Sequence, residues 1–200
     1  RLKYNIKNDD FVFLCVSRNH PKKGLNILYQ AYKIFQDKYK NNKIKLIIYG
    51  TDVKKLNLNK INFLESPPIL LEEKKDYLEK NQIMDTYPTD DVVNLYKISD
   101  VFVFPSLIES FGIVLIEAMA AKLPIVSTDT DGCKDVLLDG KHGMLVEKNN
   151  PKQLMEAMSK IYNDKELRNH YKSVNKNILN RYDLENVTNE YLELYNRIIL

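Results

Sequence analysis

The sequence predicts an α/β fold in which a doubly wound parallel sheet carries helices on both faces. Short, continuously apolar runs recur along the chain, such as FVFLCVS at 11–17 and VFVF at 101–104. Runs of this kind are typical of strands that are buried on both faces. Segments with the apolar spacing of amphipathic helices separate these runs. The chain has 200 residues, 44% of them hydrophobic, which fits one domain with a sizeable core.

The first half of the chain begins with a strand at 11–17 and an amphipathic helix over 23–40. The apolar stripe of this helix comprises Leu25, Leu28, Tyr29, Tyr32 and Phe35. KLIIYG at 45–50 predicts a second buried strand, which ends at a glycine. The less regular segment beyond it predicts, in order, a strand at 61–65, a polar surface helix at 71–81 and a short strand at 82–87.

The second half continues the alternation of strands and helices. A helix at 90–99, with Thr89 near its N-cap, precedes the strand at 101–104, which ends at Pro105. A helix containing ESFGIVLIEAMAAK then leads to a strand at 124–128. The remaining elements that we expect are a helix at 132–138, a turn at 140–143, a strand at 144–147, and helices at 151–163, 165–180 and 184–199, the last with Asp183 as its N-cap.

Doubly wound sheets bind ligands at the carboxyl ends of their strands, so the residues after each strand are the candidates for a site. SRNHPKKG at 17–24 places Arg18 and Lys23 on one loop, and Gly24 opens the next helix. Two cations near a helix N-terminus suit a phosphate group. Solvated loop charges are the alternative, and this loop alone favours that alternative.

The stretch ESFGIVLIE, which follows the strand at 101–104, carries two carboxylates eight positions apart, Glu109 and Glu117. Gly112 allows close approach of a ligand, and the amides around Phe111, Gly112 and Ile113 are expected to be free first-turn donors. Carboxylates accept hydrogen bonds, so sugar or ribose hydroxyls would suit both glutamates. Interaction of Glu109 with the helix dipole and an ion pair of Glu117 with a lysine are the structural alternatives.

Several other function classes find no support. The formal charge of +3 is too balanced to indicate nucleic acid or an anionic membrane. Neither GxGxxG nor GxxxxGK[ST] occurs, and the cysteines and histidines lack zinc-ligand spacing. Ser106 and Ser110 lack the partners of a serine hydrolase. DTD at 129–131 could bind a metal, but a turn with an aspartate capping the next helix explains it better.

Taken together in chain order, these segments resemble the C-terminal, donor-binding half of a family 4 retaining glycosyltransferase with the GT-B fold. VSRNHPKKG resembles the arginine–lysine loop of that family, and IKLIIYG its second strand. YPTDDVVNLYKISDVFVFPS is similar to the helix and strand that lead to Pro-Ser. ESFGIVLIEAMAAKLPIVSTDTDG resembles the Glu-x7-Glu signature and the strand beyond it, and GKHGMLVEKNNPKQLMEAM the next turn, strand and helix.

The resemblance implies a Rossmann-like domain that binds a nucleotide diphosphate-sugar and needs neither a metal nor another cofactor. Arg18 and Lys23 would hold the diphosphate and stabilise the leaving group, and Glu109 would accept hydrogen bonds from the donor sugar. Glu117 would bind the ribose hydroxyls. The other implied donor-binding residues are Ser110, Phe111, Gly112 and Ile113 at the helix start, with amides facing phosphate, and Tyr87 at the nucleobase.

The sequence departs from the family pattern at a few positions. Ser17 stands where a glycine usually precedes the arginine, and Thr51-Asp52 replaces part of Gly-x-Gly. Ser110 and Asp131 each replace a common glycine. Segment 53–86 is longer than is typical, with an extra charged helix at 71–81 that could cover the sheet or contact a partner or an acceptor.

We expect residues 1–200 to form one nucleotide-sugar-binding domain. The other half of such enzymes, an N-terminal acceptor domain, has no counterpart here, and the chain starts at Arg1. The resemblance therefore implies a glycosyltransferase, specifically a hexosyltransferase, of which this piece would be inactive alone. The expected location is the cytoplasm, with membrane contact only through the missing half. A nucleotide-sugar 2-epimerase-like domain and a non-catalytic nucleotide-binding module are the alternatives.

Overall fold

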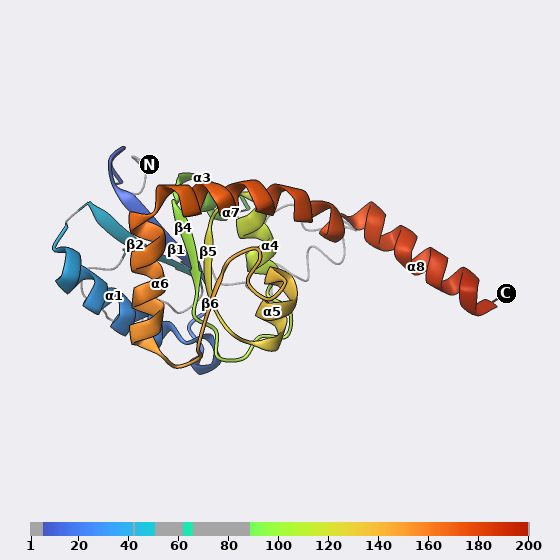
Figure 1. The fold of residues 1–200 in the computed structure, drawn as a ribbon, viewed down its shortest axis with the longest axis horizontal. Helices are drawn as coiled ribbons and strands as arrows, with labels where there is room; N and C mark the ends of the chain where they lie inside the picture. Colours follow the sequence, from blue (N-terminus) through green and yellow to red (C-terminus); the bar gives the residue numbers. More distant parts are fainter. Residues whose placement is uncertain (1–5, 42, 51–61, 66–88, 200) are drawn as a thin grey trace, which may run out of the picture.

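The computed structural model describes residues 6–41, 43–50, 62–65 and 89–199, which contain one parallel sheet (Figure 1). Its strand order is β3-β2-β1-β4-β5-β6. The strands are β1 (Phe11–Val16), β2 (Ile44–Gly50), β3 (Asn62–Glu65), β4 (Val101–Phe104), β5 (Ile125–Thr128) and β6 (Met144–Val146). The chain winds outward from β1 to β3 and then from β4 to β6, which is the Rossmann arrangement. The predicted fold class is confirmed.

Two hydrophobic cores, one on each face of the sheet, explain why the strands are continuously apolar. Phe13 and Cys15 of β1 pack against α1 (Leu25–Tyr39) and α6 (Pro151–Asn163). Val12 and Leu14, which point to the opposite face, belong to the core under α3 (Thr89–Ile98), α4 (Ile113–Ala120) and α5 (Asp131–Leu137). Successive residues of β1 therefore meet helix layers on opposite faces of the sheet.

The C-terminal helices tie the two layers together and then leave the domain. Helix α7 (Lys165–Ile178) places Tyr171 in one core and Ile178 in the other. After a 3-10 turn, α8 (Leu184–Ile199) extends away from the sheet and has no buried residue (Figure 1). Asp183 caps α8 as predicted, because its carboxylate accepts from the amide of Glu185 at 3.0 Å. None of the helices in the described part of the chain is both long and apolar enough to cross a bilayer.

Some predicted boundaries were wrong for identifiable reasons. The helix expected from residue 23 begins at Leu25, since Pro21–Lys23 form a 3-10 turn that ends at Gly24. Helix α5 begins at Asp131 rather than at 132, and its cap is the Thr130 hydroxyl, which accepts from the Cys133 amide at 3.3 Å. The prediction of an aspartate cap was therefore wrong, and Asp129 pairs instead with Lys134. The elements expected at 71–81 and 82–87 lie outside the described residues.

Candidate functional site

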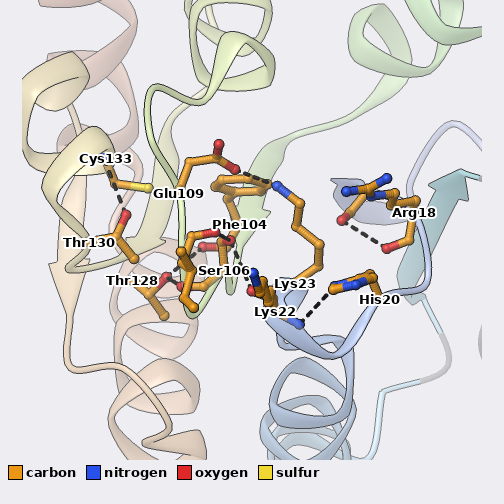
Figure 2. A network of polar contacts seen from close by, with 12 residues as sticks. Arg18, His20, Lys22, Lys23, Phe104, Ser106, Glu109, Thr128, Thr130 and Cys133 are labelled. Carbon is orange, nitrogen blue, oxygen red and sulfur yellow. Dashed lines mark hydrogen bonds and ion pairs between the residues drawn. The ribbon is translucent and has the colours of Figure 1, made fainter.

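Lys23 and Glu109 meet at the carboxyl edge of the sheet, where the winding direction reverses between β1 and β4. Lys23 follows β1 and Glu109 follows β4, and Lys23 Nζ lies 2.6 Å from Glu109 Oε2 (Figure 2). Their side chains are only 21% and 15% exposed. The ammonium also lies 5.6 Å from the centre of the Phe104 ring, a favourable cation–π geometry. This reversal point is where doubly wound folds bind ligands.

The backbone carbonyl of Lys22 joins the loop after β1, which carries Lys23, to the loop after β4. It accepts from the amide of Leu107 at 2.8 Å, from that of Ile108 at 3.3 Å and from the Ser106 hydroxyl at 3.2 Å. The next residue but one, Gly24, has a φ of 63°, and a Cβ there would lie 2.0 Å from the Pro105 carbonyl oxygen. Only glycine fits this position, because the backbones of the two loops approach so closely there. This close approach and the shared Lys22 carbonyl hold the two loops together.

Buried hydroxyls of β5 form hydrogen bonds to the end of β4 and to the loop after it. Ser106 is fully buried, and the hydroxyl of Thr128 donates to its carbonyl oxygen (Figure 2). The Ser127 hydroxyl donates to the Phe104 carbonyl at 3.2 Å. Because the Ser106 hydroxyl faces carbonyl oxygens, it is placed as a structural group rather than as a nucleophile. The Glu109 carbonyl accepts from the Gly132 amide at 3.2 Å, which anchors this loop to α5.

The start of α4 presents unused backbone donors beside the Lys23–Glu109 pair. Gly112 caps the helix with a φ of 85°, a conformation that glycine adopts without strain. Within the described ranges, the amides of Phe111, Gly112 and Ile113 find no acceptor. Ser110, Phe111 and Ile113 are exposed. This helix start can therefore bind an anion.

Arg18 contributes a second cation on the same loop as Lys23 (Figure 2). Its side chain is exposed, and no ion pair of its guanidinium is found among the residues that the structure describes. The backbone amide of Ser17, just before it, donates to the Tyr49 carbonyl at 2.8 Å and ties the loop to β2. Arg18 thus lies on a fixed strand end with its charge available to a ligand.

Glu117 lies one turn into α4 and is held by a buried tyrosine. The Tyr96 hydroxyl donates to Glu117 Oε2 at 2.8 Å, and Tyr96 is only 4% exposed. Burial and the neighbouring carboxylate raise the pKa of Tyr96, so the phenol keeps its proton. The lysine partner considered for Glu117 is not found in the described part of the chain.

Tyr96 was not predicted from the sequence, although one signal for it exists. It lies on the apolar face of α3 beside Val92 and Leu95, where a buried phenol requires a hydrogen-bond partner. The sequence does not reveal which acceptor it meets.

Two further candidates from the sequence are Tyr87 and the DTD stretch at 129–131. Tyr87 lies outside the described residues. At the DTD stretch, Asp129 Oδ1 lies 3.1 Å from Lys134 Nζ. No cluster of three or more histidine, cysteine, aspartate or glutamate residues suited to a metal occurs in the ranges described. Independence from metals remains a prediction.

Residues 1–178 match the family described as "Glycosyl transferases group 1". The chain belongs to this family. It is 29% identical over 197 residues to the capsular polysaccharide biosynthesis glycosyltransferase CapM of Staphylococcus aureus, covering 98% of the chain and 48% of CapM. It is also 32% identical over 148 residues to an uncharacterized glycosyltransferase of Methanocaldococcus jannaschii, covering 74% of the chain and 37% of that protein. The chain thus spans less than half the length of these two relatives.

Solved glycosyltransferase structures share the fold. Anabaena Alr3699/HepE in complex with UDP-glucose superposes with a TM-score of 0.76 at 20% identity, over 98% of this chain and 51% of that one. WaaG, a glycosyltransferase involved in lipopolysaccharide biosynthesis, superposes with a TM-score of 0.70 at 22% identity, over 92% of this chain and 46% of its own. The described domain therefore has the fold of the matching half of these GT-B structures.

Proposed function

We propose that this chain is the C-terminal, donor-binding domain of a retaining family 4 glycosyltransferase that uses a nucleotide diphosphate-sugar. The observation that carries the proposal is the contact between Lys23 and Glu109 beside the open N-terminus of α4. A cation, a carboxylate and free amides within one small region match a ligand that carries both phosphates and hydroxyls.

In this proposal each group has one task. Lys23 and Arg18 bind the diphosphate together with the amides at Phe111, Gly112 and Ile113. Glu109 then leaves Lys23 and accepts hydrogen bonds from the donor sugar, and Ser110, the next residue, lies beside that sugar. The ribose lies at Glu117 and the nucleobase at Tyr87.

Cations at the diphosphate assist the reaction electrostatically. The bond between the anomeric carbon and the diphosphate oxygen breaks, and its electron pair leaves with the nucleoside diphosphate. The acceptor oxygen bonds to the anomeric carbon on the same face, and its proton passes to the leaving phosphate. Lys23 and Arg18 stabilise the growing negative charge on that phosphate, so we expect no metal or other cofactor to be needed.

The acceptor site belongs, in this proposal, to a further N-terminal domain. Relatives such as CapM are about twice as long as the matched region, which leaves room for such a domain. Residues 1–200 would then form a single nucleotide-sugar-binding unit of a cytoplasmic enzyme, and any membrane contact would be made by the other half.

The test is a ligand panel of UDP, GDP, ADP and their glucose and mannose conjugates, read out by thermal shift and titration calorimetry. A ligand at about 100 times its Kd raises the free energy of unfolding by about 2.7 kcal/mol. Lys23→Met and Arg18→Met should weaken every nucleotide, because both lose phosphate contacts. Glu109→Ala should weaken mainly the nucleotide-sugars, and Glu117→Ala all of the nucleotides.

Lys43→Met is the matched control, because Lys43 also forms a 2.6 Å ion pair, with Asp9, but just before β2 at the opposite edge of the sheet. It should leave every affinity unchanged. Wild-type binding by all four site variants would show that the residues are wrongly assigned. A non-catalytic module would bind nucleotides but would fail to discriminate nucleotide-sugars through Glu109.

A further inference from the structure

Glu117 differs from an ordinary exposed carboxylate, because one of its oxygens already has a fixed donor. Tyr96 Oη lies 2.8 Å from Glu117 Oε2 and 3.4 Å from the carbonyl oxygen of Val114, in the first turn of the same helix. One phenol from α3 therefore touches both the side chain of Glu117 and the backbone that carries it. The glutamate itself is exposed to solvent.

The tyrosine is held more rigidly than the glutamate. Its ring belongs to the core between α3 and the sheet, with the Phe102 ring centre 5.6 Å away. Its hydroxyl is a permanent donor, since burial and the Glu117 charge disfavour the phenolate. A glutamate side chain has several rotatable bonds, so a fixed donor reduces the number of orientations that the free carboxylate samples.

We infer that Tyr96 is a positioning residue of the donor site: it holds Oε2 of Glu117 so that the remaining acceptor capacity of the carboxylate is presented to the two adjacent hydroxyls of a ribose. This inference rests on the proposed function, in which Glu117 binds the ribose. A carboxylate has about four lone-pair positions on its two oxygens, so one can serve Tyr96 while others serve the diol. Tyr96 itself does not contact the ligand.

The chemistry predicts selectivity for an intact ribose. A positioned carboxylate would discriminate a 2′,3′-diol from a sugar that lacks both hydroxyls, and it would not affect phosphate binding at Lys23. Loss of the Tyr96 hydroxyl should therefore lower the affinity for ribonucleotides and leave the affinity for dideoxynucleotides almost unchanged. A purely structural role would lower both affinities equally.

The experiment compares wild-type chain, Tyr96→Phe, Glu117→Ala and the double variant by titration calorimetry. The probes are whichever of UDP, GDP and ADP binds most tightly, its 2′,3′-dideoxy counterpart and inorganic pyrophosphate. Tyr96→Phe should weaken the ribonucleotide about tenfold and the other two probes less than about twofold, as expected for a hydrogen bond to a charged group. In the Glu117→Ala background, Tyr96→Phe should change nothing further.

Tyr32→Phe is the matched control. Tyr32 is 1% exposed, and its hydroxyl donates to the Ile44 carbonyl at 3.1 Å, in the core on the opposite face of the sheet. Its loss should cost similar stability and leave the affinities for all three probes within about twofold of wild type.

The outcomes distinguish a failure of the positioning role of Tyr96 from a failure of the ribose site itself. If Tyr96→Phe keeps the wild-type ratio of ribonucleotide to dideoxynucleotide affinity while Glu117→Ala loses it, the positioning role is overturned and the ribose site stands. If Glu117→Ala keeps the ratio, the proposed ribose site fails and the inference fails with it. Equal weakening of all three probes by Tyr96→Phe would also overturn the inference, because it would indicate general damage.

Discussion

At the scale of single residues, the Lys23–Glu109 ion pair is the contact that a ligand of either charged group would have to break. The two charges neutralise one another at 2.6 Å in a partly shielded position. In the proposed function, a diphosphate would have to compete with Glu109 for Lys23, whereas a complete nucleotide-sugar could satisfy both residues at once. The proposed site would therefore favour a donor that carries its sugar over a bare nucleotide.

This competition leads to a prediction for Glu109→Gln, which keeps the size of the side chain and removes its charge. The tightest binder among UDP, GDP and ADP should bind about two- to fivefold more tightly, because Lys23 no longer has an anionic partner to leave. The matching nucleotide-sugar should gain less or lose affinity. Titration calorimetry measures both ligands, with Asp9→Asn as the control for loss of an ion pair remote from the site. Weaker binding of the bare nucleotide to Glu109→Gln would contradict the competition.

Burial of Tyr96 predicts how the free energy of unfolding depends on pH above pH 10. Its pKa is raised in the folded chain above the ordinary value of 10.0, chiefly by burial. The folded state then holds a proton that the unfolded state releases, so the stabilisation is complete below pH 10 and is lost as the pH rises further. Each such tyrosine adds a slope of up to about 1.4 kcal/mol per pH unit. Urea unfolding above pH 10 should show a shallower decline in Tyr96→Phe than in wild type; an identical slope would argue against this burial effect.

At the scale of elements, the strands and most helices could be predicted because their cause is local. β1 and β4 are apolar runs between two helix layers, and α6 and α8 follow simple periodicity and caps. Loops after parallel strands meet at one edge of the sheet, so the proximity of residues on two such loops could be predicted. Lys23 and Glu109 are 86 residues apart in the chain, yet their strands are neighbours in the sheet.

Contacts between elements could not be predicted, because they depend on which side chains tertiary packing brings together. The Tyr96 donor to Glu117 and the Lys22 carbonyl as a shared acceptor have no signature in either segment alone. Thr130 rather than an aspartate caps α5, since the choice among adjacent polar residues depends on backbone geometry. Sequence patterns predicted which residues follow the strands, and packing between loops determined the partners of those residues.

The junction of the two site loops predicts a large effect of Gly24→Ala. A methyl group would meet the Pro105 carbonyl oxygen, and the φ of 63° is unfavourable for alanine. We expect a loss of about 2–4 kcal/mol in the free energy of unfolding, together with weaker nucleotide binding as Lys23 shifts. Gly140→Ala is the control, since its φ of 91° is also strained but its nearest neighbour would lie 3.5 Å away. It should cost less stability and leave binding unchanged. Urea unfolding and calorimetry distinguish the two variants; equal effects would show that the junction is not tight.

At the scale of the whole molecule, the cores on both faces of the sheet indicate that the domain would hold the proposed donor site without further chain. Both site loops are anchored within the described residues, through the Lys22 carbonyl and through Gly132. Nucleotide binding should therefore need only this domain, whereas sugar transfer needs an acceptor site that, in our proposal, belongs to the other half.

Nucleotide binding and sugar transfer should be separable in the 200-residue chain. The 200-residue chain should bind its nucleotide with the same affinity, within about twofold, in EDTA and in Mg²⁺, because Lys23, Arg18 and the amides of α4 supply the positive charge at the diphosphate. The same preparation should transfer no sugar from any nucleotide-sugar that it binds, as judged by release of nucleoside diphosphate above the rate without protein. Lys23→Met should weaken binding to the same extent in both conditions, which would exclude adventitious association. A strong requirement for Mg²⁺ would contradict the proposed electrostatics, since a divalent cation would then be carrying the charge assigned to Lys23 and Arg18. Steady transfer by this chain alone would instead contradict the assignment of the acceptor site to another domain.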